Sequence, residues 1–311
     1  MRIAVMGAGA MGGYIGGRLA LAGRDVTFIA RGKHLRAIRE NGLQVQGPDG
    51  AFTVEGAAAT DDPAEVGPVD LILFCVKSYD VPQAARMMRP MVGPATVVIP
   101  VQNGIGHIEV LGQVLGKDKV LGGVSLISAE KAAPGVVKHN QAGSSIEFGE
   151  IEGGHSSRCE LVEQTLAVEG INVRASSRIL ERMWWKFAAY SGVGVICLAR
   201  SNRGVVWRTP ETKVLYREAV AEAVAIAQGK GVPLPDSVPD EHVAILDSFP
   251  PEWEPSELVA IQAGRPLELE ALQGALCAIG REVGVPTPIN DMVYACLKPY
   301  IDGPPQQEQA P

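Results

Sequence analysis

The segment Met183–Cys197 of this 311-residue chain is nearly all apolar, and its only charged residue is Lys186, between Trp185 and Phe187. A lysine in such a place either extends its ammonium group to solvent along an apolar stem or is desolvated for chemistry. Partial desolvation lowers the pKa of a lysine from about 10.4 toward neutral pH. A lysine of this kind can protonate a developing alkoxide. The residue types alone leave both interpretations of Lys186 open.

A glycine pattern near the N-terminus, Gly7-Ala8-Gly9-Ala10-Met11-Gly12, fits G-x-G-x-x-G and lies between a strand pattern and a helical pattern. Gly7 allows a tight turn, Gly9 lets the backbone approach a pyrophosphate, and Gly12 lets the helix pack close to the sheet. The start of that helix supplies N–H groups and partial positive charge for the phosphates. The alternative is a glycine turn that only packs tightly, but the strand–turn–helix context favours dinucleotide binding.

The end of the second predicted strand indicates which dinucleotide is bound. NAD-binding folds usually carry an acidic residue there for the ribose 2′-hydroxyl, whereas this segment reads FIARGKH and contains none. Arg31 can bind a 2′-phosphate through two hydrogen bonds, and Lys33 adds positive charge. We therefore predict NADP(H) as the cofactor. The alternative is that Arg31 is a solvated loop residue.

Two further polar residues follow buried strand patterns: Lys77 comes after VDLILFCV, and Asn103 comes after TVVIPV. Ligands of open α/β sheets bind outside the carboxyl ends of the strands, so we expect both residues on the side of the glycine loop. The alternatives are a solvated loop lysine and an ordinary Asn-Gly turn. The five histidines show no ligand spacing, and we predict no metal site.

The elements that must position these residues change in character along the chain. Up to residue 175 strands alternate with helices. Strands are predicted at 2–6, 25–30, 69–76, 96–101, 120–127, 135–139, 145–151 and 171–175, a hairpin at 43–57, and helices at 11–22, 34–41 and 158–168. Continuous apolar strands that alternate with helices predict an α/β fold with a parallel, doubly wound sheet of the Rossmann type.

After residue 176 helical periodicity dominates, interrupted by proline-rich loops. The predicted helices are 177–200, 210–231, 255–263, 266–284 and 288–300. We therefore predict a dinucleotide-binding domain at 1–175, an all-helical catalytic domain at 176–302 and a disordered tail at 303–311. The active site is expected between the two domains.

Composition restricts the possible partners. The formal charge of -7 argues against nucleic acid or an anionic membrane. No apolar run reaches the roughly 18 to 20 residues of a spanning helix, and no signal peptide is recognisable. Five scattered cysteines indicate reduced thiols in a cytoplasmic protein. We predict a small-molecule substrate, with no nucleic-acid or membrane partner.

Six motifs together resemble the ketopantoate reductase (2-dehydropantoate 2-reductase) family, in order and over essentially the whole chain. They are GAGAMG, FIAR, CVKSYD, VQNG, WWKFA and SELVAIQAGRPLELEALQG. The resemblance implies a Rossmann domain followed by a helical domain. It also implies the NADPH-dependent reduction of a 2-oxo acid, 2-dehydropantoate to pantoate, on the route to pantothenate and coenzyme A.

The resemblance further implies roles for single residues at the cofactor. Gly7 to Gly12 would bind the pyrophosphate, and Arg31 the 2′-phosphate. Lys77 and Asn103 would line the nicotinamide end, where Asn103 also meets the substrate. Glu268 would reach the cofactor from the helical domain.

The same resemblance assigns the chemical step. Lys186 matches the family's catalytic lysine, the general acid, and Glu268 matches the glutamate beside it. Ser256 matches a substrate-contacting serine. From the residues alone, Glu268 can also be an exposed acid at the start of a helix that Pro266 begins. Ser256 can equally be a helix N-cap.

One segment departs from the family. Two asparagines typically follow the lysine there at i+4 and i+8, on one helix face, but here these positions hold Tyr190 and Gly194. Tyr190 can donate one hydrogen bond but is larger, and Gly194 is expected to open space. Arg200 or Asn202 can replace the lost contacts, an arginine being suited to a carboxylate; alternatively both are ordinary loop residues. Because hydrogen-bonding sites discriminate strongly, the exact 2-oxo acid stays open.

Three functions therefore compete. The first is an NADPH-dependent 2-oxo acid reductase, with 2-dehydropantoate as the leading substrate and a bulkier or less hydroxylated 2-oxo acid as the alternative. The second is a non-catalytic NADP(H) sensor, against which Lys186, Ser256 and Glu268 argue. The third is an opine-type or β-hydroxyacid dehydrogenase, against which the late SELVAIQAGRPLELEALQG motif argues. A homodimer is compatible with all three.

Overall fold

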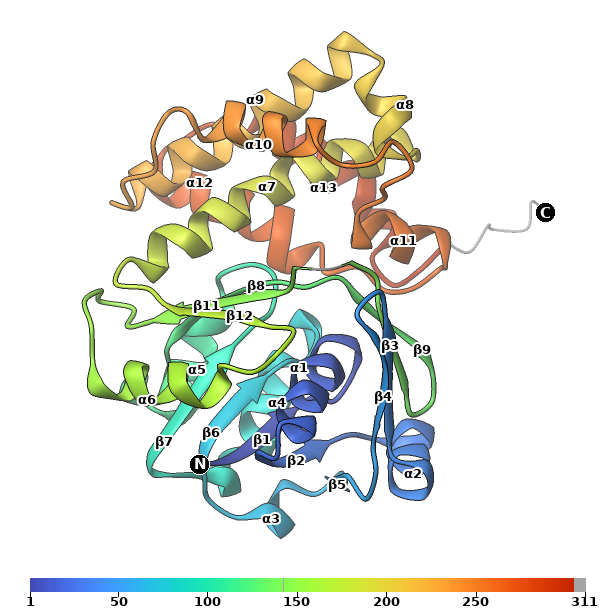
Figure 1. The fold of residues 1–311 in the computed structure, drawn as a ribbon. Coiled ribbons are helices and arrows are strands. Elements are labelled where there is room, and N and C mark those ends of the chain that lie inside the picture. Colours follow the sequence, from blue (N-terminus) through green and yellow to red (C-terminus); the bar gives the residue numbers. More distant parts are fainter. Residues whose placement is uncertain (142, 305–311) are drawn as a thin grey trace, which may run out of the picture. The chain divides into compact units, whose positions relative to one another are not determined.

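The computed structural model describes residues 1–141 and 143–304, which divide into two compact units (Figure 1). The first unit contains residues 1–102 and 106–180, and the second contains residues 103–105 together with the chain from Glu181 onward. The division after Leu180 falls inside helix α7 (Ile179–Ala199). Of the tail predicted at 303–311, residues 305–311 lie outside the described residues.

A five-stranded parallel sheet forms the centre of the first unit, with the strand order β5-β2-β1-β6-β7 (Figure 1). All of its pairings are parallel. Its strands are β1 (Arg2–Met6), β2 (Asp25–Ile29), β5 (Ala58–Thr60), β6 (Val69–Phe74) and β7 (Val92–Pro100). The predicted parallel sheet of the Rossmann type is confirmed.

Helices cover both faces of this sheet. They are α1 (Ala10–Leu21), α2 (Gly32–Asn41), α3 (Pro63–Val66), α4 (Val81–Met87), α5 (His107–Leu115) and α6 (Ser157–Leu166). Successive residues of a strand point to opposite faces, so Ile3 and Val5 of β1 join a core with α1, whereas Ala4 and Met6 join a core with α4 and α5. The sheet is therefore doubly wound, as its continuous apolar strands predict.

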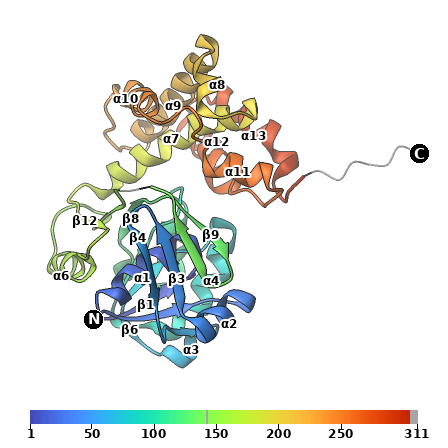
Figure 2. The same cartoon turned by 45° about the vertical axis from the view of Figure 1, so that its right-hand side comes forward.

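The other strands in the described part of the first unit form two smaller sheets instead of extending the parallel one. The first has the order β4-β3-β10-β9, with β3 (Leu43–Gly47), β4 (Gly50–Val54), β9 (Ala129–Ala133) and β10 (Val136–His139). The second has the order β12-β11-β8, with β8 (Gly122–Leu126), β11 (Ser145–Gly149) and β12 (Asn172–Ala175). Helix α1 packs on β3, β9 and β10 (Figure 2).

The predicted hairpin at 43–57 is the antiparallel pair β3–β4. The strands predicted around β8, β10, β11 and β12 are present, but apolar runs do not say which partner a strand takes. The exposed, charged strand β9 (AEKAA) was not predicted, because it has no alternating apolar face.

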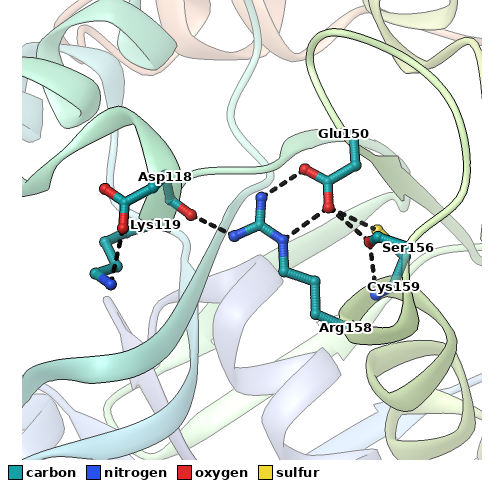
Figure 3. Close-up of polar contacts among 6 residues, drawn as sticks. All are labelled: Asp118, Lys119, Glu150, Ser156, Arg158 and Cys159. Carbon is teal, nitrogen blue, oxygen red and sulfur yellow. Dashed lines mark hydrogen bonds and ion pairs between the residues drawn. The ribbon is translucent and has the colours of Figure 1, made fainter.

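An ion-pair cluster joins the start of α6 to the segment before β8 (Figure 3). Arg158 donates from Nε and Nη2 to the carboxylate of Glu150 at 2.7 and 2.5 Å, and from Nη1 to the carbonyl oxygen of Asp118. Ser156 donates to Glu150 at 2.6 Å and caps α6 by accepting from the Cys159 N–H. Hydrogen bonding to Arg158 lowers the pKa of Glu150, and burial raises the pKa of the Cys159 thiol. The cluster is structural, and its cysteine is not activated.

The second unit is helical, as predicted. Its helices after α7 are α8 (Arg203–Trp207), α9 (Pro210–Gly229), α10 (Val238–Asp247), α11 (Ser256–Gln262), α12 (Ala275–Val283) and α13 (Pro288–Leu297), with a π-helix η4 (Glu270–Gly274) before α12. Helices α7 and α9 approach at Gly192, where a Cβ would lie 2.4 Å from the Tyr216 ring. Glu222 of α9 accepts hydrogen bonds from the first N–H groups of α13, at Ile289 and Asn290, which have no backbone partner within their own helix.

Helices α8 and α10 were not predicted: α8 has only five residues, and α10 begins within the proline cluster at 232–239, which indicated a loop. Among the described residues, no helix combines the length and the apolar character that a membrane crossing requires.

Candidate active site

The glycine loop follows β1, and its three glycines have different structural reasons. Gly7 has φ +97°, and a Cβ there would lie 2.9 Å from Val76. A Cβ at Gly12 would lie 2.3 Å from the carbonyl oxygen of Gly7. Nothing lies within 4 Å of a Cβ at Gly9, the N-cap residue of α1. The loop therefore closes tightly at its two ends and leaves the start of α1 open to a ligand.

His34 holds this loop from α2, a role that the sequence did not predict. Its Nε2 lies 2.7 Å from the carbonyl oxygen of Ala8, and the N–H of Gly135 donates to its Nδ1 at 2.9 Å. Since Nδ1 accepts, the ring proton is on Nε2 and the ring is neutral. Burial lowers the pKa of His34 in agreement with this state. Both partners are backbone atoms, so no sequence motif marks the contact.

Arg31 is the N-cap residue of α2, directly after β2. Its guanidinium is mostly exposed, and Nη2 lies 3.5 Å from the carboxylate of Asp80. Asp80 ends the short 3-10 turn Ser78–Asp80, which follows Lys77. A carboxylate thus stands beside Arg31, although the end of the second strand itself has none. Arginine suits a 2′-phosphate and a carboxylate suits a 2′-hydroxyl, so this pair bears directly on the choice of cofactor.

In the second unit the structure brings Lys186 and Asn103 together. Nζ of Lys186 donates to Oδ1 of Asn103 at 3.1 Å. The next residue, Gly104, has φ +84°, and a Cβ there would lie 2.6 Å from the carbonyl oxygen of Ala271 in η4. Asn103 is therefore both a turn residue and a contact of the lysine, and only glycine lets its loop pack on η4.

Burial and two carboxylates control the charge of Lys186. Desolvation lowers the pKa of Lys186 to about 8, and the negative charges of Glu257 and Glu268 oppose this shift. The ammonium group of Lys186 is desolvated and hydrogen-bonds to the side-chain amide of Asn103. This contact favours a role in chemistry over a lysine that extends to solvent. A pKa near working pH is the property that a general acid needs.

Tyr190 lies one turn after Lys186 on α7 and also hydrogen-bonds to Asn103. Burial, followed by the charges of Glu257 and Glu268, raises its pKa well above the ordinary tyrosine value. Tyr190 is therefore a neutral phenol that can donate a hydrogen bond at any physiological pH.

Glu268 is buried, with 8% of its surface exposed, and does not lie in an α-helix. The prediction of a helix over 266–284 is wrong in its first part: residues 265–268 are not helical, and η4 is a π-turn in which the Gly274 N–H donates to Leu269 at 2.9 Å. The alternative of an exposed acid at a helix start is thus contradicted. Such π-turns often occur at functional sites.

Ser256 is exposed and is the first residue of α11, whose N-cap residue is Pro255. The N-cap alternative for Ser256 is therefore wrong. Its hydroxyl donates to Oε2 of Glu257 at 3.0 Å. A role for Glu257 in the site was not predicted from the sequence. Its signal there was an acidic residue next to Ser256 in the motif SELVAIQAGRPLELEALQG.

Gly194 does not leave room for a side chain, contrary to the expectation. A Cβ there would lie 2.5 Å from Val293 and 2.8 Å from the amide nitrogen of Gln273. That amide donates to the carbonyl oxygen of Tyr190 at 2.7 Å. Gly194 does border a small, shallow hollow, which Cys197, Glu257 and Gln273 share with valine, leucine and isoleucine side chains.

Arg200 and Asn202, the suggested replacements, have structural contacts. Arg200 has φ +52°, and its guanidinium lies 4.1 Å from the centre of the Tyr300 ring. Asn202 caps α8 by accepting from the Val205 N–H at 3.2 Å. Arg200 therefore makes a cation–π contact, and Asn202 is a helix cap, so both residues have a structural role. Across residues 1–141 and 143–304, no cluster of His, Cys, Asp or Glu is arranged to hold a metal ion.

A doubly wound parallel sheet with a glycine loop after β1, joined to a helical unit, defines the class of Rossmann-type oxidoreductases. The chain belongs to the ketopantoate reductase family. The family "Ketopantoate reductase PanE/ApbA" matches residues 3–153, and its C-terminal family matches residues 178–301. The resemblance inferred from the six motifs is confirmed.

Similar proteins match nearly the whole chain. A 2-dehydropantoate 2-reductase of Mesorhizobium japonicum is 30% identical over 96% of this chain and 97% of its own length. One of Halobacterium salinarum is 30% identical over 93% of this chain and 95% of its own. The crystal structure of 2-dehydropantoate 2-reductase from Geobacter metallireducens matches with a TM-score of 0.90 at 29% identity, covering 96% of this chain and 99% of that one.

Proposed function

We propose that this protein reduces a 2-oxo acid with NADPH, that Lys186 is the general acid, and that 2-dehydropantoate is the leading substrate. The observation that carries the proposal is the hydrogen bond from a desolvated lysine to Asn103, in a chain of the ketopantoate reductase family.

The residues of the first unit fit a dinucleotide. The start of α1 is open at Gly9, so its N–H groups can bind a pyrophosphate. The mostly exposed guanidinium of Arg31 can bind a 2′-phosphate through two charged hydrogen bonds. When bound, NADPH supplies a hydride for the carbonyl carbon of the substrate.

The second unit supplies the proton. As the carbonyl oxygen gains negative charge, the Lys186 ammonium group donates a proton to it and becomes a neutral amine, which then takes a proton from water. Asn103 accepts a hydrogen bond from Nζ and so orients the donor. Glu268 helps to keep the lysine protonated before the reaction. The neutral phenol of Tyr190 can donate a second hydrogen bond to the substrate.

The side chains at the departing positions support the less hydroxylated alternative substrate, whereas Val293 and Gln273 fill the space at Gly194 that a bulkier 2-oxo acid would need. Tyr190 replaces an amide by a phenol, and the hollow beside Gly194 is bordered mainly by apolar side chains. A substrate hydroxyl group would find fewer partners there than two asparagines would give. Use of NADP(H), a homodimer and a cytoplasmic location all remain predictions.

The proposal is tested by NADPH consumption with 2-dehydropantoate, with a branched-chain 2-oxo acid and with an aromatic one. We expect turnover with at least one of the three, and the ratio of their kcat/KM values identifies the substrate class. Tight NADPH binding without turnover on any of them would contradict the enzyme and favour the non-catalytic sensor. Faster turnover with NADH would contradict the assignment of the cofactor.

A further inference from the structure

Glu257 is an acidic residue of the second unit for which neither the motifs nor the family resemblance gave a role. It is the second residue of α11 and accepts a hydrogen bond from Ser256 at 3.0 Å. It borders the hollow beside Gly194 and Cys197 of α7. Residues 186, 190, 194 and 197 follow one another at helical spacing, so they share one face of α7. Glu257 therefore lies beside the face of α7 that carries Lys186.

The charge of Glu257 acts on three groups along this face. It is the larger of the two charges that oppose the desolvation of Lys186. After burial, it is also the main charge that raises the pKa values of Tyr190 and Cys197. Such interactions weaken with distance, and Glu257 borders the same hollow as Gly194 and Cys197 on this face of the helix.

We propose that Glu257 is a positioning residue of the reductase site, which works with Glu268 to keep Lys186 as an ammonium ion inside a desolvated cluster. The inference rests on the proposed function, in which Lys186 donates the proton. A desolvated lysine without an opposing charge loses its proton near or below neutral pH, and it would then have none to give. Glu257 thus sets the upper pH limit of the reaction.

The other groups around Lys186 and Glu257 do not titrate in the same range. Tyr190 and Cys197 of α7 stay neutral because burial raises their pKa values. Glu268, before η4, adds a second negative charge to the lysine, and Arg200 at the end of α7 acts on Cys197. The lysine is accordingly the group whose titration a change at Glu257 moves.

The direct test is the pH dependence of acetylation of Lys186 by trace amounts of acetic anhydride, measured by mass spectrometry on the peptide that contains it. The variants are Glu257→Gln, which removes the charge with little change in shape, and Glu252→Gln, a matched control at an exposed acid in the loop before α11. We expect the labelling midpoint near 8 in the wild type, an unchanged midpoint in Glu252→Gln, and a midpoint lower by about one unit in Glu257→Gln.

This readout needs no activity, so it separates the inference from the proposed function. A wild type that reduces 2-oxo acids, with the same Lys186 midpoint in folded Glu257→Gln, overturns the inference alone. An inactive wild type whose midpoint still falls in Glu257→Gln overturns the proposed reaction and upholds the influence of Glu257 on the lysine. If Glu257→Gln does not fold, Glu257→Met, which suits the apolar hollow, gives the same test with the same overturning result.

In an active enzyme, the high-pH limb of the pH profile of kcat/KM reports the loss of the Lys186 proton. We expect this limb to move to lower pH in Glu257→Gln by the amount that the labelling midpoint moves, while Glu252→Gln keeps the wild-type profile. A lower kcat with an unmoved basic limb assigns Glu257 a merely structural role and overturns the inference.

Discussion

The candidate site residues of the two units are arranged in different ways. In the first unit, the loop after β1 is shaped by Gly7 and Gly12, where a Cβ would lie within 3 Å of other atoms of the protein. In the second unit, the cluster around Lys186 consists of side chains, namely an amide, a phenol and two carboxylates, whose charges set the lysine's pKa. The first arrangement depends on shape and the second on charge. Substitutions and pH should therefore affect the two units differently.

The largest effect is expected from the glycine loop, where two glycines three residues apart should differ in their effect on stability. Gly12→Ala places a methyl group 2.3 Å from a carbonyl oxygen, so we expect a loss of stability of about 3 kcal/mol or more together with loss of NADPH binding. Gly9→Ala meets nothing within 4 Å, so it should weaken NADPH binding at an unchanged Tm.

Thermal unfolding and NADPH titration of both variants check this prediction. A stable Gly12→Ala protein, or a Gly9→Ala protein that binds NADPH as the wild type does, would break the distinction between a packing glycine and a ligand-facing one.

The pair Arg31–Asp80 tests whether charge also matters in the first unit. Arg31→Ala removes the group for a 2′-phosphate, so kcat/KM with NADPH should fall by about 10- to 100-fold relative to NADH, the size of a charged hydrogen bond of about 1.5–3 kcal/mol. Asp80→Asn removes the competing carboxylate at 3.5 Å and should shift the preference toward NADPH. Steady-state kinetics with both cofactors measure the ratio; an unchanged ratio in both variants would count against NADP specificity through Arg31.

Tyr190→Phe tests a single hydrogen bond in the second unit. The half-buried ring stays in place while the hydroxyl that contacts Asn103 is lost, so kcat/KM should fall by about 5- to 10-fold, or about 1 kcal/mol. Because the phenol is neutral, the pH profile should keep its shape. A moved basic limb in Tyr190→Phe would show that the phenol, and not the lysine alone, titrates in the reaction.

The smallest effect is a loss of stability in mild acid that both units share. Burial lowers the pKa values of His34 and His139 in the first unit and of His242 in the second. As the pH falls through about 6.5, the unfolded chain takes up protons that the folded histidines do not, so the free energy of unfolding decreases. Denaturant unfolding at several pH values between about 5 and about 7.5 checks this. His242→Gln should weaken the pH dependence, and stability that rises on acidification would contradict the sign.

The sequence predicted those parts of the molecule that are local in the chain. The glycine loop, the continuous apolar strands and the isolated charge of Lys186 are each visible within a dozen residues. Helix α7 was also predictable, because its helical periodicity is uninterrupted in the sequence. These signals were sufficient for the parallel sheet, the helical second unit and the family.

What the sequence did not predict depends on contacts between distant segments. His34 binds backbone atoms, Asp80 reaches Arg31 from another loop, and the space at Gly194 is filled by Gln273 and Val293. The helix expected from Pro266 begins later because Glu268 is buried ahead of a π-turn. Periodicity cannot show any of these arrangements, since it describes one element at a time.

The central claim is that Lys186 donates the proton and is not needed to bind the cofactor, whose phosphates are bound by the first unit. It is tested most directly by comparing Lys186→Ala with the wild type in NADPH titration and in single-turnover reduction of the best 2-oxo acid. The account predicts an unchanged Kd for NADPH and a reduction rate lower by about 10²- to 10⁴-fold, the usual contribution of a general acid. A Lys186→Ala protein that reduces the substrate at the wild-type rate would contradict it.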